Sequence, residues 1–255
     1  MAPVTFALHH VHKTYNSGAI ALQDMTLQVP TGQFVSLVGP SGCGKSTVLR
    51  LLAGLEQPSQ GQIDRPSIEA GFSLAYVFQE PALLPWATVT ENVALPLKLA
   101  GQSPRQRQTA VADILAKVGL TEFGRAYPRE LSGGMKMRVS IARALVTQPQ
   151  VLLMDEPFGA LDEITRSQLN EELLDLWQRQ QWTVVFVTHN LYEAVYLSSR
   201  VVVMASKPGR SIADLPIDLP YPRHPDLRTS PQCNRYCREI AHLLHPGSWN
   251  IASGA

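Results

Sequence analysis

The chain has 255 residues, of which 45% are hydrophobic and 17% charged, so it can bury a substantial core as one large domain or two lobes. Its 22 basic and 21 acidic residues give a formal net charge of +1, which argues against the broad basic field of a nucleic-acid-binding protein. No stretch approaches the roughly 20 apolar residues that span a bilayer, and no export signal is expected at the start, so any membrane role should come through a partner.

The first half of the chain alternates strand-like and helical patterns. Apolar and polar residues alternate between residues 5 and 30, which predicts short strands that form an antiparallel flank. A short apolar run then leads into a glycine-rich loop, and helical spacing follows the loop as far as Gly54. Aliphatic and β-branched runs predict further buried strands at residues 74–78, 150–155, 182–188 and 200–205.

The stretch from residue 89 to about 147 carries three helical patterns without a convincing strand, which predicts an inserted helical lobe. After Pro208 the chain is rich in proline and ends with a short predicted helix. We therefore predict an α/β fold with a mainly parallel core sheet, an antiparallel β flank and the helical lobe. The predicted boundaries are 1–86 and 148–206 for the core with its flank, 87–147 for the lobe and 207–255 for a C-terminal extension.

The glycine-rich loop reads "GPSGCGKST", and its Gly39, Gly44, Lys45 and Ser46 fit the phosphate-loop pattern G-x-x-x-x-G-K-[ST]. The strand before it and the helix after it disfavour the alternative of an ordinary glycine turn. Glycines let backbone N–H groups close around phosphate oxygens, and the helix start adds a partial positive charge. Lys45 is expected to bridge the outer phosphates, and Ser46 to offer its hydroxyl to Mg²⁺.

Two adjacent carboxylates end the strand predicted at residues 150–155. Asp155 can hold a Mg²⁺-bound water, and Glu156 can take a proton from an attacking water. Without the phosphate loop upstream, this sequence would also fit a strand that ends in an acidic turn. Together with the loop, the two carboxylates predict nucleotide hydrolysis.

Two further polar residues follow predicted strands. His189 reaches the sheet edge where ligands of open α/β folds bind, and it could hydrogen-bond the terminal phosphate, although a polar turn residue is the alternative. Gln79 follows the strand at 74–78, and its amide could contact Mg²⁺ or the attacking water.

A second glycine motif, "LSGGM", precedes a helical pattern that runs to Leu145. One loop already binds one nucleotide, so a second cradle for the same nucleotide is not needed. The economical hypothesis is that Ser132, Gly133 and Gly134 bind the outer phosphate of ATP held by another copy of the chain. Two chains placed head to tail would then enclose two ATP molecules.

The order of these motifs resembles the ATPase subunit of ABC transporters over about residues 5–206. The shared features are the glycine loop, Gln79, "LSGG", "LLMDEP", "GALD" and His189. The segments "ALLPWATVTENV" and "EPFGALDE" more narrowly resemble the nitrate, sulfonate and taurine importer ATPases. The resemblance implies one ABC ATPase domain with a RecA-like core, which binds ATP and Mg²⁺ and hydrolyses ATP.

The resemblance also implies a role for each matching residue. Tyr15 would stack on the adenine, although a half-buried strand tyrosine is the alternative. Asp162 would serve communication across the dimer, and Gln79, Glu156 and His189 would serve hydrolysis. The implied ATP-binding residues are Tyr15, Gly39, Pro40, Ser41, Gly42, Cys43, Gly44, Lys45, Ser46 and Thr47. The implied metal ligands are Ser46, Gln79 and Asp155, and the residues for ATP on a second copy are Ser132, Gly133, Gly134 and Asp162.

The sequence departs from the family pattern at three positions. Met135 and Met137 stand where glutamine is usual, and Asn190 stands where aspartate is frequent. Because the cradle relies on Ser132 and backbone N–H groups, Met135 should weaken one polar contact at most.

Leu83, Leu84 and Trp86 could pack against a partner helix, and the resemblance implies a membrane subunit there. The alternative is that they belong to the core of the small lobe.

The histidines and cysteines outside these motifs are weak metal candidates. His10 and His12 share a strand face, but we expect no carboxylate or cysteine beside them. Cys233 and Cys237 lie four residues apart without a second ligand pair. The odd number of cysteines, with Cys43 inside the loop, favours a reducing cytosol over a disulfide framework.

We therefore expect the ATP-hydrolysing motor of an ABC importer for a nitrate-, sulfonate- or taurine-like solute. Its expected partners are a second ATPase subunit in a homodimer, transmembrane permease subunits and a periplasmic or surface solute-binding protein, but no nucleic acid. The expected location is the cytoplasmic face of the inner membrane, as a peripheral protein. The alternatives are a soluble non-transport ABC ATPase, which usually has two cassettes or coiled coils, and a P-loop kinase, which leaves "LSGG" and His189 unexplained.

Overall fold

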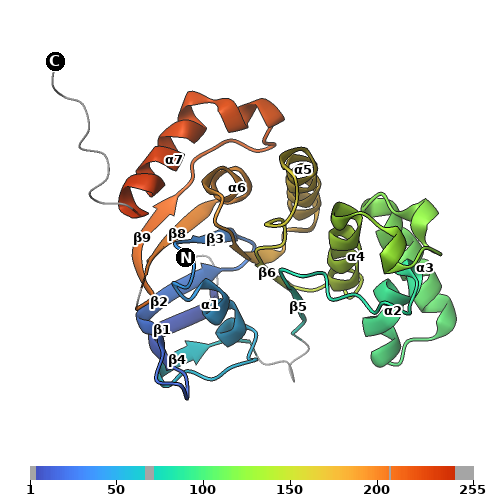
Figure 1. Cartoon of the computed structure of the whole chain (residues 1–255), viewed down its shortest axis with the longest axis horizontal. Coiled ribbons are helices and arrows are strands. Elements are labelled where there is room, and N and C mark those ends of the chain that lie inside the picture. Colours follow the sequence, from blue (N-terminus) through green and yellow to red (C-terminus); the bar gives the residue numbers. More distant parts are fainter. Residues whose placement is uncertain (1–3, 67–71, 207, 245–255) are drawn as a thin grey trace. The chain divides into compact units, whose positions relative to one another are not determined.

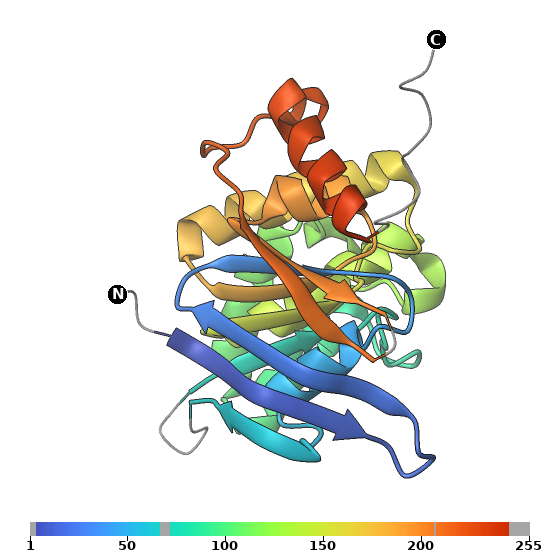
Figure 2. The ribbon, with the colours of Figure 1, turned by 90° about the vertical axis from the view of Figure 1, so that its left-hand side faces the viewer.

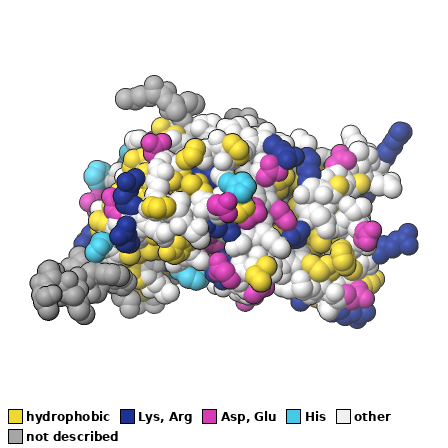
Figure 3. Space-filling model, turned by 90° about the horizontal axis from the view of Figure 1, so that it is seen from above, with side chains coloured by type: hydrophobic (Ala, Val, Ile, Leu, Met, Phe, Trp, Pro, Cys, Tyr) yellow, Lys and Arg dark blue, Asp and Glu magenta, His cyan; other side chains and the backbone are white. Residues whose placement is uncertain are grey.

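The computed structural model describes residues 4–66, 72–206 and 208–244, and the chain divides into two compact units (Figure 1). Unit 1 comprises Met1–Ser67 and Gln181–Ala255, and unit 2 comprises Ile68–Gln180. On the molecular face drawn in Figure 3, basic and acidic side chains are interspersed, as the net charge of +1 suggests. No helix of the described ranges combines the length and apolar composition that crossing a bilayer requires.

Unit 1 contains the predicted antiparallel flank, a sheet of strand order β2-β1-β4 (Figure 2). β1 (Val4–Thr14) and β2 (Ile20–Pro30) are longer than expected, with 11 residues each, and buried and exposed residues alternate along most of β2. β4 (Gln60–Asp64) was not predicted, since most of its five residues are exposed and only Ile63 is a large apolar residue. Pairing with β1, rather than its own composition, stabilises it as a strand.

Unit 1 also contains a parallel set in which β3 (Phe34–Val38) lies between β7 (Thr183–Val187) and β8 (Arg200–Ala205). Every residue of β3 and β7 is buried, which explains why these strands appear as continuous apolar runs. β9 (Arg210–Pro216) pairs antiparallel to β8 at the edge. The helices of this unit are α1 (Lys45–Leu52), α6 (Leu191–Leu197), the short η4 (Pro225–Thr229) and α7 (Pro231–Leu244).

The predicted C-terminal helix is α7, and it packs on α6 and β8. Cys233 and Cys237 are buried in this cluster beside Val201 and Val203. They therefore serve as core residues of unit 1. Among the residues that the structure describes, no three His, Cys, Asp or Glu side chains gather into a possible metal site.

Unit 2 pairs β5 (Leu74–Val77) in parallel with β6 (Val151–Asp155). The three helices expected between residues 89 and 147 are present as α2 (Val89–Leu99), α3 (Pro104–Lys117) and α4 (Gly133–Leu145). Capping boxes at Thr88 and Ser103 begin the first two. The remaining elements are α5 (Glu163–Gln180) and the short helices η2 (Thr121–Phe123) and η3 (Pro128–Glu130).

The predicted fold class is confirmed, with parallel pairing in both units, an antiparallel flank and a group of helices between β5 and β6. The predicted limits of the lobe at 87 and 147 and of the C-terminal extension at 207 stay predictions. One expectation on the flank is wrong: His10 does have a carboxylate beside it. Its Nδ1 lies 2.6 Å from Oδ1 of Asp24, and both residues have left-handed backbones at an irregularity of the β1–β2 pair.

Candidate functional site

The predicted phosphate loop lies in unit 1 between β3 and α1. Gly44 is the N-cap residue of α1, with φ of 90°, and no described side chain caps the first turn of this helix. A helix start without a side-chain cap suits an anion, because backbone N–H groups gather there and the helix dipole favours negative charge. The ammonium of Lys45 donates to the carbonyl oxygens of Gly39, at 2.8 Å, and Pro40, at 3.1 Å, which holds the charge against the loop.

Close backbone approach explains why glycines form this loop. A Cβ atom on Gly39 would lie 2.7 Å from the carbonyl oxygen of Met204, and one on Gly44 would lie 2.8 Å from that of Ala21. At Gly42, by contrast, an added Cβ would meet no atom within 4 Å, so this part of the loop is open to a ligand. The loop thus combines a packed base with an accessible backbone, as a phosphate cradle requires.

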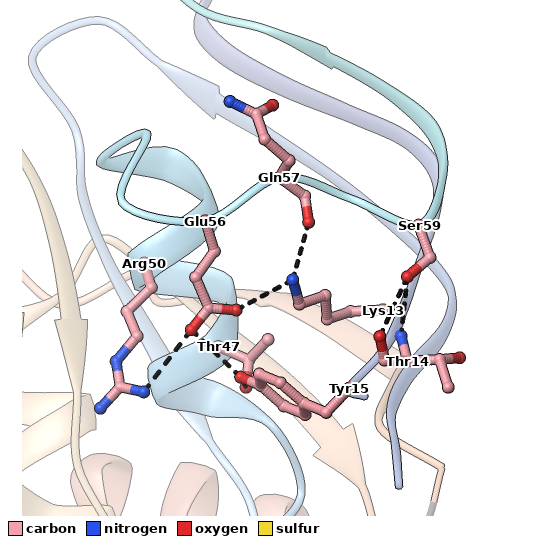
Figure 4. Close-up of polar contacts among 8 residues, drawn as sticks. All are labelled: Lys13, Thr14, Tyr15, Thr47, Arg50, Glu56, Gln57 and Ser59. Carbon is pink, nitrogen blue, oxygen red and sulfur yellow. Dashed lines mark hydrogen bonds and ion pairs between the residues drawn. The ribbon is translucent and has the colours of Figure 1, made fainter. Parts of the chain in front are cut away.

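Tyr15 follows β1 in a tight turn, and its hydroxyl reaches α1 (Figure 4). The hydroxyl lies 3.2 Å from Oγ1 of Thr47 and 3.2 Å from Oε1 of Glu56. The structure therefore brings Tyr15 and Thr47, two predicted ATP-binding residues, into direct contact. Tyr15 is half-buried and directly follows β1, so stacking on adenine stays a prediction beside the alternative of a half-buried strand tyrosine.

His189 lies at the same edge of unit 1 as the phosphate loop. It follows β7, which is the parallel neighbour of β3, and the preceding Thr188 donates its N–H to the carbonyl of Leu37. The side chain of His189 is exposed, as a residue that meets a ligand must be. Asn190 is the N-cap of α6 and accepts the N–H of Glu193 at 3.1 Å, so asparagine fulfils the capping role that aspartate would fulfil.

In unit 2, Gln79 and Asp155 lie at the carboxyl ends of the parallel strands β5 and β6. Asp155 is only 8% exposed, and its Oδ2 accepts a hydrogen bond of 3.1 Å from the hydroxyl of Tyr76. Glu156 has a left-handed backbone, with φ of 45°, which costs a non-glycine residue about 1 kcal/mol. Such strain directly after a strand is typical of functional turns.

Unit 2 also gathers the residues of the second glycine motif. Ser132 is the N-cap of α4, and its Oγ accepts the N–H of Met135 at 3.2 Å. Gly134 faces α5, because a Cβ there would lie 2.6 Å from Cγ2 of Thr165. Asp162 accepts the N–H of Thr165 at 3.0 Å, and this hydrogen bond lowers the pKa of Asp162. Two helix N-termini thus meet, with Ser132, Gly133 and Asp162 exposed.

The methionine substitutions fit this packing. Met135 contributes the capped N–H through its backbone, which a glutamine would also do. Met137 is 3% exposed and belongs to the apolar core of unit 2.

A groove of about 710 Å³ lies between α2 and α3 in unit 2. Its lining includes Trp86, Ala94, Leu95 and Val111. Trp86 is 74% exposed in this chain, so the alternative that it belongs to the core of the small lobe is wrong, whereas Leu83 and Leu84 are half-buried.

Comparison with known proteins decides the family of this chain. The family model described as ABC transporter matches residues 22–159, which is more than half of the sequence. The chain belongs to the ABC transporter family. Its resemblance to that family is thereby confirmed, as are the ABC ATPase fold, ATP binding and ATPase activity.

Relatives of this ABC protein include two named importer components. The nitrate import ATP-binding protein NrtD of Synechocystis sp. is 45% identical over 246 residues, covering 93% of this chain and 92% of that protein. The aliphatic sulfonates import ATP-binding protein SsuB of Bacillus licheniformis is 44% identical over 225 residues, covering 86% of each. A solved dimeric ATP-binding cassette, MJ0796 bound to ADP and Pi, matches with TM-score 0.74 and 33% identity over 84% of this chain and 99% of that one.

Two residues of this ABC ATPase were not predicted from the sequence although they contact predicted site residues. Glu56 contacts Tyr15, and Tyr76 contacts Asp155. Each contact joins ordinary polar residues that are distant in the sequence, so no local pattern marks them.

Proposed function

We propose that this chain is the ATP-hydrolysing subunit of an ABC importer that drives the uptake of a nitrate-, sulfonate- or taurine-like solute through a separate permease. The observation that carries the proposal is the identity of 44–45%, over most of the chain, to NrtD and SsuB, which are named as import ATP-binding proteins. Both relatives are named as import proteins, which favours a transporter over a soluble ABC ATPase.

In this proposal, the loop from Gly39 to Ser46 wraps the phosphates of ATP, with Thr47 beside it and Tyr15 stacked on the adenine. The uncapped start of α1 and the open backbone at Gly42 support phosphate binding. Lys45 supplies a positive charge for the outer phosphates.

Mg²⁺ is the proposed metal, with oxygen ligands from Ser46, Gln79 and Asp155. Hydroxyl, amide and carboxylate oxygens are the donors that this hard cation prefers. When bound, it neutralises negative charge on the phosphates. Glu156 accepts the proton of the attacking water, and His189 hydrogen-bonds the terminal phosphate.

A second copy of the chain completes each ATP site in the proposal. Ser132, Gly133 and Gly134 present the start of α4 to ATP bound by that copy, and Asp162 lies beside them. The solved MJ0796 cassette is dimeric with ADP and Pi bound, which supports this arrangement.

The remaining partners are permease subunits and a periplasmic or surface solute-binding protein, at the cytoplasmic face of the inner membrane. Exposed Trp86 and the adjoining groove of unit 2 are the proposed permease contact. Genes for a permease and a binding protein beside this gene would support the importer, whereas their absence together with full activity in a membrane-free extract would contradict it.

Two variants test the shared ATP site. With saturating ATP and Mg²⁺, Glu156→Gln should bind ATP without hydrolysing it and become dimeric by light scattering. Ser132→Arg should abolish turnover and still bind ATP as a monomer. A monomeric Glu156→Gln variant, or normal hydrolysis by Ser132→Arg, would contradict a site shared between two copies.

A further inference from the structure

The side chain of Glu56 joins Tyr15 to helix α1 (Figure 4). Glu56 follows α1 by four residues, whereas Thr47 lies in the first turn of the same helix. The hydroxyl of Tyr15 lies 3.2 Å from Oε1 of Glu56 and 3.2 Å from Oγ1 of Thr47. One hydroxyl therefore connects the first turn of α1, the helix that carries Lys45, with the segment that follows this helix.

The direction of these hydrogen bonds follows from their chemistry. A carboxylate can only accept, so the single hydroxyl hydrogen of Tyr15 goes to Glu56. The oxygen of Tyr15 then accepts from the hydroxyl of Thr47. Because its acceptor is charged, the bond to Glu56 is the stronger of the two.

Basic residues hold the Glu56 carboxylate in place. Lys13 Nζ lies 3.3 Å from Oε2, and Arg50 NH1 lies 3.6 Å from Oε1. Lys13 also donates to the carbonyl of Gln57 at 2.9 Å. The side chain of Glu56 is only 18% exposed, so its position is set by the fold and not by solvent.

Lys13 also covers one face of the Tyr15 ring, which leaves the other face for a nucleotide base. Lys13 Nζ lies over this ring, 5.2 Å from its centroid. A base that stacks on Tyr15 would therefore use the opposite face. The bonds from its hydroxyl to Glu56 and Thr47 hold the end of the Tyr15 side chain in place.

We propose that Glu56 is a positioning residue for recognition of the purine base of ATP, through its hydrogen bond to Tyr15. It fixes the ring against the helix that carries the phosphate-binding residues, so the base and the triphosphate meet one preorganised surface. This inference rests on the proposed stacking of Tyr15 on adenine.

The test compares binding of ATP with binding of inorganic triphosphate, by calorimetry on the purified chain. Glu56→Ala should weaken ATP binding about tenfold and leave triphosphate binding unchanged, because the triphosphate has no base. Glu56→Gln keeps an acceptor oxygen and should restore part of the loss. The matched control is Glu239→Gln, an exposed position on α7, which should bind both ligands as the natural chain does.

A double-variant cycle tests whether Glu56 acts through the hydroxyl. In a Tyr15→Phe background, Glu56→Ala should cause no further loss of ATP affinity. An equal loss in both backgrounds, or a parallel loss of triphosphate binding, would overturn the inference and assign Glu56 a general structural role. Tyr15→Ala separates the proposed stacking on adenine from the proposed role of Glu56. If Tyr15→Ala binds ATP normally, the stacking is wrong. If Tyr15→Ala binds ATP weakly and Glu56→Ala binds it normally, only the inference on Glu56 fails.

Discussion

The hydroxyl of Tyr76 donates a hydrogen bond to Oδ2 of Asp155 from the neighbouring strand, at 3.1 Å. Asp155 is buried, so its carboxylate has few ways to satisfy its lone pairs. The bond occupies one oxygen and orients the other. A residue of β5 thus positions the proposed metal ligand at the end of β6.

Replacing Tyr76 by phenylalanine should raise the Mg²⁺ concentration needed for half-maximal ATPase activity by about tenfold, because a ligand that loses its orienting partner binds metal less well. A titration of activity with Mg²⁺ at saturating ATP measures this. Tyr236→Phe is the matched control, since it removes a tyrosine hydroxyl that accepts from the N–H of Asp218 in unit 1. Equal Mg²⁺ dependence of both variants would rule out a role for Tyr76 at the metal.

Gly209 should be essential to the phosphate loop although it lies far from it in sequence. A Cβ atom there would lie 2.0 Å from the carbonyl oxygen of Cys43, so Gly209→Ala must displace the loop. We expect ATP affinity to fall at least about tenfold in a binding titration. Gly101→Ala is the control, because its Cβ meets nothing within 4 Å, and it should cost only about 1 kcal/mol of stability for its left-handed backbone. Unchanged ATP affinity in Gly209→Ala would show that the loop does not depend on this contact.

Asp162 should contribute stability that depends on pH. The N–H of Thr165 lowers the pKa of this carboxylate in the folded chain, so its contribution is present above the ordinary aspartate pKa and is lost as the pH falls through the lowered value. Asp162→Ala should therefore lower the unfolding midpoint at pH 7, with a gap to the natural chain that narrows as the pH falls below the ordinary aspartate pKa. Asp113→Ala, at an exposed position on α3, is the control. A gap that persists unchanged at low pH would assign the loss to something other than the carboxylate charge.

Much of the site was predictable because phosphate binding requires particular residue types at adjacent positions in the sequence. A phosphate cradle requires glycines, a lysine and a helix start in succession, so Gly39 to Ser46 carry their own signal. Asp155 and Glu156 stand out because buried strands rarely end in two carboxylates. The capping boxes at Thr88 and Ser103 carry an equally local signal, which predicts helix starts.

The rest depends on contacts between distant residues. β9 alternates half-buried and exposed residues and ends at a proline, so only its pairing with β8 makes it a strand. Glu56 and Tyr76 are polar residues with no local pattern, and each gains its role from a partner 41 or 79 residues away. Sequence periodicity describes burial along one helix or strand, and it does not predict which distant residues contact one another.

Asn92 supports the segment that leads to exposed Trp86, and its loss should unfold that segment first. Its side chain is fully buried: Oδ1 accepts the N–H of Leu84 at 2.8 Å, and Nδ2 lies within 3.2 Å of the carbonyls of Leu84, Ala87 and Thr88. Asn92→Ala should lower the free energy of unfolding by about 2–3 kcal/mol, because it leaves buried backbone groups without partners.

Denaturant unfolding of the purified chain measures the loss of stability. Asn92→Asp separates the hydrogen bond that Asn92 accepts from those that it donates. Aspartate keeps an acceptor for the N–H of Leu84 but cannot donate to the three carbonyls, so it should also be strongly destabilised. The groove beside Trp86 should then bind the proposed permease segment less well even where the fold survives. If Asn92→Ala unfolds within about 0.5 kcal/mol of the natural chain, the hydrogen bonds of Asn92 do not hold this surface in place.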